Sequence, residues 1–423
     1  MQQIIRNTLL EYLPADFEIE KTVNPARIFY LNKENSKTAK KGYIVYLCER
    51  EIRAKDNFAL QYGIQKSKEL SLPLIIIHPK IKYEHKSKEF FINNQLLEIK
   101  KSFEKSDLDF NIIEKEPEVF LKNFKISLLI IDFNPILKRN YLKNLECKII
   151  EMDGHNIIPA RYLSDKQEYS AATIRRKIYR NIYPFLTEYE NFTNTKTKAD
   201  YVLKDFLNNK LDYYAEQKNN PNKNVLSGLS KYINLGFISS QRIAIEIIKT
   251  DTDIKNKEAF LEELITRKEL AENFCLYSNY KTFEGIPNWA KYSLSEHKTD
   301  LRAYTYLPSD LEFGITHDIL WNATQKQLIN EGVIHGYLRM YWAKKILEWT
   351  QTPEEALDIA IYLNDKYGYD SPSSNGYTGI LWAIGGLHDR AFTDYPVTGK
   401  IRRMTFDSIR RKFNIYEYIN KYA

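Results

Sequence analysis

Residues 321–350 read WNATQKQLINEGVIHGYLRMYWAKKILEWT, a stretch that contains Trp321, Trp342 and Trp349. Trp342 and Trp349 are seven residues apart, which places both indoles on one face of a helix. A fourth tryptophan, Trp382, follows in SNGYTGILWAIGGLHDRAF (374–392). Aromatic residues at helical spacing most often belong to a core, although clustered indoles also suit redox or base-stacking chemistry. The pattern predicts a helical region and leaves its function open.

The first 152 residues have a different pattern. Short apolar runs rich in β-branched residues lie at 43–48, 72–78, 110–113, 127–132 and 147–152, with helical patterns between them at 57–70, 87–105 and 116–123. Strands that alternate with helices predict a Rossmann-like, doubly wound parallel sheet. No GxGxxG follows the first predicted strand, so the pattern itself indicates no dinucleotide site.

The character of the chain changes after Met152. A polar connection at 153–166 leads into helical periodicity at 170–190, 197–217, 238–249, 256–275, 324–349 and 353–368. A chain of 423 residues exceeds the size at which one hydrophobic core keeps growing. We therefore predict an α/β domain at 1–152, a linker at 153–185 and an all-helical domain at 186–423.

Composition and the missing motifs narrow the function classes. The net charge is +7, and basic residues gather near the C-terminus in a run that suits DNA but is more often a solvated face: Lys400, Arg402, Arg403, Arg410, Arg411 and Lys412. Three distant cysteines and seven scattered histidines form no metal-ligand spacing, so we expect no metal and a reducing, cytoplasmic location. We also expect no signal peptide and no membrane span. The sequence has no GxSxG motif and no P-loop, so it lacks the motifs that usually indicate a hydrolase or an NTPase.

The stretch 321–350 is similar to the C-terminal half of class II cyclobutane pyrimidine dimer photolyases, members of the photolyase/cryptochrome family. The resemblance includes EEALDIAIYLNDKYGYD (354–370), residues 374–392 and GKIRRM (399–404). Upstream it covers SDKQEYSAATIRRKI (164–178), LSGLSKYINLGFISSQR (226–242) and FLEELITRKELAENFCLY (260–277). Residues 1–150 match more weakly. The resemblance implies an N-terminal Rossmann-like domain followed by a helical domain that binds FAD.

The resemblance implies a set of residues around the FAD phosphates and nucleotide. The phosphates would lie on the loop of Leu226, Ser227, Gly228, Leu229 and Ser230, where hydroxyls and free backbone N–H groups at a helix start suit an anion. By itself, SGLS is more often a capping and turn sequence. Tyr214 and Asn219 match positions that contact the flavin nucleotide, and Lys218 matches a basic residue near the DNA.

Around the flavin ring, the resemblance implies a pair of Arg339 with Asp370, and Asn364 and Asn375 as candidates for a hydrogen bond near N5. A charged donor there would stabilise an anionic reduced flavin. The loop reads Asp-Ser-Pro-Ser-Ser-Asn-Gly at 370–376, whereas the family usually has Asp-Gly-Arg-Asp-Pro-Asn-Gly, so the partner of N5 stays open. Trp342, Trp321 and Trp349 match the electron-transfer pathway, with Trp342 nearest the flavin.

For DNA, the resemblance implies a pocket for the flipped-out lesion, which needs an aromatic wall, a polar group for base edges and basic residues for the backbone. Met340, Trp382 and Glu263 match that pocket, and Glu263 is counted among the cofactor-binding residues as well. Arg390 and Arg402 match a pair that grips DNA. An alternative for Glu263 is an exposed i,i+4 ion pair with Arg267. Arg267 stands where many photolyases have a stacking tryptophan, which leaves Trp382 as the main platform.

The resemblance implies light-driven repair of pyrimidine dimers in UV-damaged DNA by a monomer. The alternatives are a cryptochrome-like photoreceptor without repair activity, repair of the (6-4) photoproduct with His335 or His388 as an acid, and a DNA-binding module without catalysis. A deazaflavin antenna on the N-terminal domain and no antenna at all stay equally open, since residues 46–56 (YLCEREIRAKD) depart from the usual class II sequence.

Overall fold

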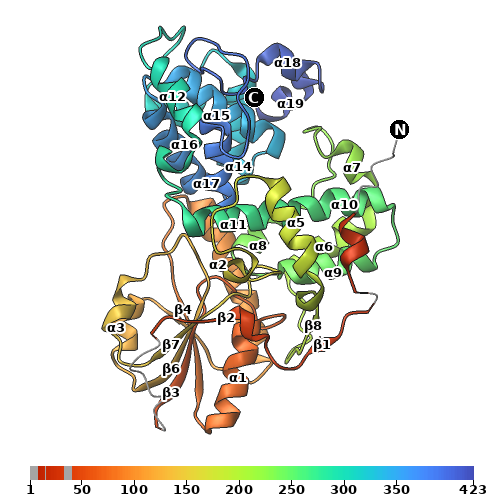
Figure 1. The fold of residues 1–423 in the computed structure, drawn as a ribbon, viewed down its shortest axis with the longest axis vertical. Coiled ribbons are helices and arrows are strands. Elements are labelled where there is room, and N and C mark those ends of the chain that lie inside the picture. Colours follow the sequence, from red (N-terminus) through yellow and green to blue (C-terminus); the bar gives the residue numbers. More distant parts are fainter. Residues whose placement is uncertain (1–7, 15, 33–40) are drawn as a thin grey trace.

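The computed structural model describes residues 8–14, 16–32 and 41–423. A sheet with flanking helices forms one end of the molecule, and helices form the rest (Figure 1). The strands are β2 (Ile28–Tyr30), β3 (Tyr43–Leu47), β4 (Leu74–Pro79), β5 (Phe110–Ile113), β6 (Ile126–Asp132) and β7 (Lys148–Met152). Their order is β2-β7-β6-β3-β4-β5, and all neighbours are parallel except β2 and β7. The predicted doubly wound sheet and the helical second part are thus confirmed.

The sheet is buried on both faces, which explains its continuous apolar runs. In β3, alternate side chains enter different clusters because a strand has a side-chain period of two. Ile44 and Tyr46 pack toward α1 (Phe58–Leu70) and α2 (Lys86–Glu104), while Val45 and Leu47 join the cluster on the opposite face. That second face includes residues of α3 (Pro117–Leu121).

Two short pairings escaped the sequence analysis. Strand β2 runs antiparallel on the outer edge of β7, and β1 (Ile19–Glu20) pairs with β8 (Glu188–Tyr189) in a separate parallel sheet. Strands of two or three residues give no readable alternation. The β1–β8 pair nevertheless joins the beginning of the chain to the helical part.

Sixteen helices follow within residues 153–423, all of them described. They are α4 (Ala160–Leu163), α5 (Ala171–Asn181), α6 (Lys198–Asn209), α7 (Tyr214–Gln217), α8 (Ser230–Asn234), α9 (Ser240–Lys249), α10 (Ile254–Leu261), α11 (Lys268–Tyr277), α12 (Asn288–Glu296), α13 (Pro308–Phe313), α14 (Ile319–Glu331), α15 (Gly336–Trp349), α16 (Pro353–Tyr367), α17 (Ser374–Gly385), α18 (Phe406–Arg410) and α19 (Ile415–Tyr422). The prediction of one helix at 324–349 is wrong, because Gly332 takes φ +67° and ends α14. The predicted helix at 256–275 is interrupted by a π-helical turn, Glu262–Arg267.

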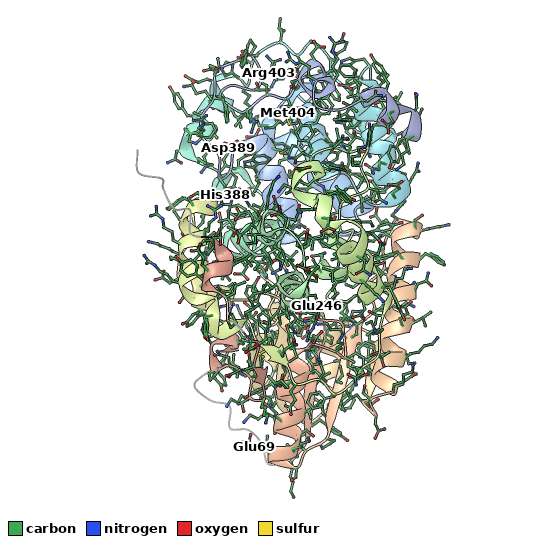
Figure 2. The ribbon with its side chains drawn as sticks, turned by 90° about the vertical axis from the view of Figure 1, so that its right-hand side faces the viewer. Glu69, Glu246, His388, Asp389, Arg403 and Met404 are labelled. Atoms are coloured by element: carbon green, nitrogen blue, oxygen red, sulfur yellow. The ribbon has the colours of Figure 1, made fainter. Side chains whose placement is uncertain are left out.

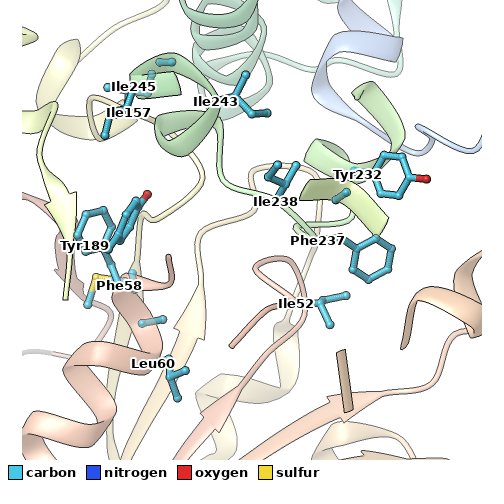
Figure 3. Packing of buried hydrophobic residues seen from close by; sticks show 14 of the residues in the cluster. Ile52, Phe58, Leu60, Ile157, Tyr189, Tyr232, Phe237, Ile238, Ile243 and Ile245 are labelled. Carbon is cyan, nitrogen blue, oxygen red and sulfur yellow. The ribbon is translucent and has the colours of Figure 1, made fainter. Parts of the chain in front are cut away.

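The hydrophobic core is continuous between the sheet and the first helices of the second part. One cluster includes Phe58 of α1, Tyr189 of β8, Phe237 and Ile243, and Figure 3 shows these side chains around the same region. A second cluster fills the upper helices and contains Trp321, Trp342 and Trp349. The domain boundaries at 152 and 185 stay predictions.

Candidate functional site

The three predicted pathway tryptophans lie together in the upper core, all nearly inaccessible to solvent. Trp321 of α14 donates from Nε1 to the carbonyl oxygen of Trp342 at 3.0 Å, and Trp342 donates to Oε1 of Gln325 at 2.8 Å. The rings of Trp321 and Trp349 meet edge to face with centroids 5.4 Å apart. The indole N–H groups of Trp321 and Trp342 therefore both have an acceptor, as buried indoles require.

Aromatic contacts continue from Trp349 toward the surface. The ring of Trp349 lies 5.3 Å from Tyr306 and 5.4 Å from His317, and His317 stacks on Tyr304 at 3.7 Å. Tyr304 is half exposed. The sequence analysis missed these three residues because they lie before α14, outside any helical period. The structure thus links a buried indole to the surface through rings in contact.

The predicted flavin-ring residues meet where α15, α16 and α17 converge. Arg339 Nη2 lies 3.3 Å from Asp370 Oδ1, and Arg339 Nη1 lies 3.4 Å from Oδ1 of the buried Asn364. A Cβ at Gly376 would lie 3.0 Å from Nδ2 of Asn364, so α16 and α17 approach closely here. Asn375 precedes Gly376 and is exposed. The structure brings Arg339, Asp370 and Asn364 together.

Two neighbouring helices leave one stripe of residues uncovered, which we call the accessible stripe. Within α17, whose residues are all described, the residues that are not buried are Asn375, Thr378, Gly379 and Trp382. Their spacing of i, i+3, i+4 and i+7 defines one helix face. On α15, which packs against α17, the stripe comprises Gly336, Arg339 and Met340. Matched flavin and lesion residues therefore lie on accessible parts of two helices that pack together.

The accessible stripe and the 226–230 loop fit a nucleotide cofactor. A Cβ added at Gly228, Gly336 or Gly379 would meet nothing of the described structure within 4 Å, so backbone is open to a ligand at each. Gly228 has φ +67°, which suits glycine, and Ser227 Oγ accepts from the N–H of Leu229 at 3.3 Å. Ser371 Oγ is buried without a hydrogen-bond partner among the described residues. Open backbone and an unused hydroxyl match a group with phosphate and amide oxygens.

The loop of 226–230 alternates buried and accessible positions. Leu229 is buried and Leu226 half-buried, whereas Gly228 and Ser230 are exposed. Helix α8 begins at Ser230, and the side chain of Leu229 provides no cap for its first N–H groups. The N–H groups of Tyr232 and Ile233 bond to the carbonyl oxygen of Leu229, which leaves those of Ser230 and Lys231 for the predicted phosphate role.

Tyr214, Lys218 and Glu263 lie close to one another. Lys218 Nζ lies 2.9 Å from Glu263 Oε1 and 5.6 Å from the centroid of the Tyr214 ring. Tyr214 is buried against Phe260, and Asn219 is exposed. The two predicted DNA-side residues, Lys218 and Glu263, are thus paired with each other.

The alternative ion pair between Glu263 and Arg267 is wrong. Arg267 Nε lies 3.2 Å from Glu262 Oε1 instead, and Arg175 of α5 lies 2.6 Å from the same oxygen. The cause is the π-helical turn, in which a wider turn brings residues five apart onto one face. Glu263 is therefore turned away from Arg267 and is free to meet Lys218.

The two predicted DNA-gripping arginines lie on one loop after α17. Arg390 and Arg402 are exposed, and each guanidinium lies over the ring of Phe392, at 5.5 and 5.6 Å. Figure 2 shows His388, Asp389, Arg403 and Met404 of this loop in the upper, helical part. The structure thus brings Arg390 and Arg402 to one place.

Trp382 has a charged neighbour that the sequence analysis missed. The ammonium of the buried Lys344 donates to the carbonyl oxygen of Ala383 at 2.7 Å and lies 5.9 Å from the Trp382 ring. Burial lowers the pKa of Lys344 to about 8. A buried lysine four residues after Met340 looks like core in the sequence, so no pattern pointed to it.

The two histidines considered as acids are poor ones. Burial lowers the pKa of His335 and of His388 to about 4, so both rings are neutral at pH 7.

Among the described residues, no group of three or more metal-ligating side chains could hold a metal ion. No described helix is both long and apolar enough to span a bilayer.

The carboxyl edge of the sheet, where doubly wound folds commonly bind ligands, is filled by protein groups. Asp132 Oδ2 accepts from the backbone N–H groups of Glu49, Arg50 and Glu51 at 2.9, 2.8 and 3.0 Å, and Oδ1 accepts from Tyr46 at 2.8 Å. The Asp132 carboxylate thus takes the place that an anion would occupy on successive N–H groups.

Arg50 extends this network into the helical part. Its guanidinium binds both carboxylate oxygens of Glu272 on α11, at 2.6 and 2.9 Å, and the pair is almost inaccessible to solvent. Burial alone would raise the pKa of Glu272, but the charge of Arg50 lowers it to about 2. The two parts of the molecule are joined by this buried ion pair.

Comparison with known proteins gives one consistent result. No family model matches the chain. The chain is 33% identical to the deoxyribodipyrimidine photo-lyase of Potorous tridactylus over 100% of this chain and 88% of the relative, and 34% identical to that of Arabidopsis thaliana over 94% and 93%. The deoxyribodipyrimidine photo-lyase of Methanothermobacter thermautotrophicus is 31% identical over 94% of this chain and 98% of its own.

The fold has a counterpart among solved structures. A bacterial class III photolyase from Agrobacterium tumefaciens superposes with a TM-score of 0.64, over 93% of this chain and 88% of that one. At 16% identity this likeness concerns the fold alone. The identities above, extending over almost the whole of this chain and of its relatives, carry the assignment. The chain belongs to the photolyase/cryptochrome family.

Proposed function

We propose that this protein is a deoxyribodipyrimidine photo-lyase that binds FAD and repairs cyclobutane pyrimidine dimers in UV-damaged DNA under light. The accessible stripe carries this proposal, because it presents Arg339, Asn375 and Trp382 on two helices that pack together, both with open glycine backbone. The chemistry that FAD supplies when bound is light-driven one-electron reduction of the lesion, as the resemblance to class II enzymes implies. All other roles belong to this chain's own residues.

Trp382 and Met340 would hold the flipped-out lesion. An extruded base needs an aromatic face on which to stack and polar groups that recognise its edge. Trp382 and Met340 supply the apolar wall on α17 and α15, and Glu263 supplies a carboxylate. Glu263 first has to exchange its contact with Lys218 for one with the bases, which frees the Lys218 ammonium for a phosphate. Arg390 and Arg402 would bind the backbone beside the lesion.

Trp342, Trp321 and Trp349 would conduct electrons from the surface to the flavin site. Their contacts support this role, because Trp321 touches both other members and Trp349 reaches the half-exposed Tyr304 through His317. Arg339 would hold positive charge beside the flavin ring, with Asp370 and Asn364 fixing its orientation.

We favour a cyclobutane dimer over a (6-4) photoproduct as the lesion. The (6-4) alternative needs a histidine acid, and both candidate histidines have a pKa of about 4. An imidazole with that pKa is mostly neutral at pH 7, which disfavours an imidazolium as the acid. We propose no antenna at the carboxyl edge of the sheet, because Asp132 and Arg50 occupy it.

Repair of an oligonucleotide that contains one thymine dimer tests the proposal, with purified protein whose flavin has been photoreduced. Trp382→Ala should retain photoreduction and lose about tenfold or more in repair, since stacking contributes about 1–3 kcal/mol per base. Trp342→Phe should lose photoreduction and retain repair once its flavin is reduced chemically. Trp289→Phe is the matched control, because Trp289 lies outside the contacts of the three pathway tryptophans.

Three results would contradict the proposal. Purified protein without flavin would favour a DNA-binding module, and photoreducible FAD without repair in any variant would favour a photoreceptor. Repair of the (6-4) photoproduct in preference to the dimer would reassign the substrate.

A further inference from the structure

Lys88 reaches from the sheet part of the molecule into the candidate flavin site. It is the third residue of α2, yet its side chain is almost completely buried. The ammonium donates to the carbonyl oxygens of Asp365 and Ser371, both at 2.7 Å. These two carbonyls belong to the end of α16 and to the 368–373 loop that follows it. One lysine therefore connects α2 to the segment between α16 and α17.

The position of Lys88 has no local explanation. A positive charge in the first turn of a helix opposes the helix dipole, and burying an ammonium costs several kcal/mol unless its charge is compensated. The compensation comes from α16, whose last carbonyls lack partners within the helix and carry the negative end of its dipole. The ring of Tyr83 adds a contact at 5.2 Å. Lys88 thus caps α16 from another part of the chain.

The segment that Lys88 holds carries the candidate flavin contacts. Asp370, which pairs with Arg339, lies within the 368–373 loop, and Asn375 follows one turn later. This loop lacks the arginine that the family usually has, with Pro372 in its place. Lys88 brings a positive charge to the loop from outside. Burial lowers the pKa of Lys88 to about 8, while Asp365 and Asp370 raise it, so the ammonium form predominates at pH 7.

A second lysine approaches the same carboxylate. Lys231 follows the candidate phosphate loop, and its ammonium lies over the rings of Phe91 at 4.8 Å and Tyr369 at 5.7 Å. Asp370 raises the pKa of Lys231 as it does that of Lys88, although burial lowers both. Asp370 therefore has Arg339, Lys88 and Lys231 as charged neighbours, while Asp365 also faces Lys88 and Glu331 also faces Lys231.

We propose that Lys88 is a positioning residue of the flavin site, which fixes the 368–373 loop and adds a buried positive charge that favours the anionic reduced flavin. This inference rests on the proposed function, since it requires flavin beside Arg339 and Asp370. Its role is distinct from that of Arg339, because Lys88 acts through backbone carbonyls and through the charge of its ammonium.

The test uses Lys88→Met, which removes the charge and its donors, and Lys88→Arg, which retains both. Lys86→Met is the matched control, since Lys86 lies on the same helical turn and is exposed. In flavin-free protein, hydrogen exchange is measured at the amides of Tyr369 and Ser371, which bond to the carbonyls of Gly332 and Gly368. In flavin-loaded protein, the measured quantity is the two-electron reduction potential.

For Lys88→Met we expect faster exchange at both amides and a preference for reduced over oxidised flavin that is about tenfold weaker. For a two-electron couple, tenfold corresponds to a potential about 30 mV lower. Lys88→Arg should restore most of both values, and Lys86→Met should match the wild type. If Lys88→Met is insoluble, Lys88→Gln, which keeps a donor without the charge, takes its place.

An unchanged potential in Lys88→Met, with only its melting temperature lowered, would overturn the inference and leave Lys88 as a structural tie. Unchanged exchange at Tyr369 and Ser371 would remove the positioning role. Failure of the proposed function is recognised separately, because then the wild-type protein itself would purify without flavin or would repair no dimers.

Discussion

The carboxyl edge of the sheet and the accessible stripe on α15 and α17 differ in how far their polar groups are already bound by other groups of the protein. At the sheet edge, Asp132 takes up three successive backbone N–H groups and Arg50 takes up Glu272, so the protein supplies both donors and acceptors. Along the stripe, open glycine backbone and half-exposed polar side chains remain. A doubly wound sheet therefore does not by itself locate a ligand. A ligand site is better located by polar groups that still lack hydrogen-bond partners within the protein.

This difference also separates stability from function. Groups buried at the sheet edge hold the two parts of the molecule together, and their loss should be measured as unfolding free energy. The polar pair at the stripe, Arg339 with its partner Asp370, contributes little to stability, because both side chains are partly accessible and their charged atoms are 3.3 Å apart. Variants there should change ligand binding far more than folding.

The largest effect is expected at Asp132. Asp132→Ala leaves three backbone N–H groups and the hydroxyl of Tyr46 without their acceptor in a site closed to solvent. Since each unsatisfied buried donor costs about 1–3 kcal/mol, we expect a loss of about 4 kcal/mol or more in unfolding free energy. Urea titration followed by circular dichroism measures it. Added formate should recover part of the loss, because it is a carboxylate small enough to replace the missing one.

Asp109→Ala is the control, because Asp109 is exposed and its carboxylate accepts from the side chain of Asn111, while its backbone bond with Ile76 does not depend on the side chain. It should stay within about 0.5 kcal/mol of the wild type. If Asp132→Ala lost less than about 1 kcal/mol, the sheet edge would not be held by this carboxylate, and the contrast with the stripe would fail.

The second prediction concerns the loss of unfolding free energy at low pH. In the folded protein the pKa of Glu272 is about 2, below its ordinary value of 4.5, so its stabilising contribution is present above pH 4.5 and is lost as pH falls toward 2. Glu272→Gln should lose about 3 kcal/mol at pH 7, because Arg50 stays buried without its counter-charge. The difference between wild type and variant should shrink between pH 4.5 and pH 2.

Glu269 makes the variant comparison necessary. Burial raises the pKa of Glu269 to about 7, so this neighbour contributes with the opposite sign and weakens the fold as pH rises from 4.5 to 7. Subtracting the Glu272→Gln curve from that of the wild type isolates Glu272. Glu246→Gln is the control, since its pair with Arg242 is partly exposed and should contribute at most about 1 kcal/mol. A difference that stays constant from pH 7 to pH 2 would contradict the assignment.

Local sequence patterns predicted the elements of the sheet well. Each of the five parallel strands lies in an apolar run and has four to seven residues, and runs of this kind stand out whatever their partners are. The break at Gly332 was missed because apolar periodicity continues on both sides of it. The sequence analysis considered Glu263 as the ion-pair partner of Arg267, whereas the partner is Glu262. This difference was missed because a π-helical turn has no sequence signal in a helix of ordinary period.

The residues of the candidate site were predicted from the family resemblance, whereas the residues that support the site were not predicted. Trp321, Trp342 and Trp349 share one recognisable segment, so their proximity could be predicted. Lys88 and Arg50 could not, because their partners lie more than 200 residues away, and a single charged residue in a helix or loop looks like solvated surface. Long-range pairing of isolated charges is set by the fold and leaves no local pattern.

The smallest effect on stability is expected at His297. Its pH dependence is opposite in direction to that of Glu272 at the sheet edge. His297 Nδ1 lies 2.6 Å from Asp300 Oδ2 and Nε2 lies 2.8 Å from Asp394 Oδ1, and the same Asp300 oxygen accepts from the N–H of Val397. The hydrogen bond to Asp300, and then that to Asp394, raises the pKa of His297 above 6.5. Its contribution is therefore fully present below pH 6.5 and is lost as pH rises through the raised pKa, the reverse of Glu272.

Since His297 is partly exposed, the loss should be local to the loop between Arg390 and Arg402 and should leave the unfolding free energy nearly unchanged. Hydrogen exchange at Val397, corrected for its intrinsic pH dependence, should accelerate from pH 6 to pH 9 in the wild type. His297→Gln should show fast exchange at every pH, because glutamine carries no charge to attract both carboxylates. Equal pH dependence in the two proteins would exclude His297 as the group that holds this loop, and would leave the buried ion pair at the sheet edge as the molecule's pH-sensitive contact.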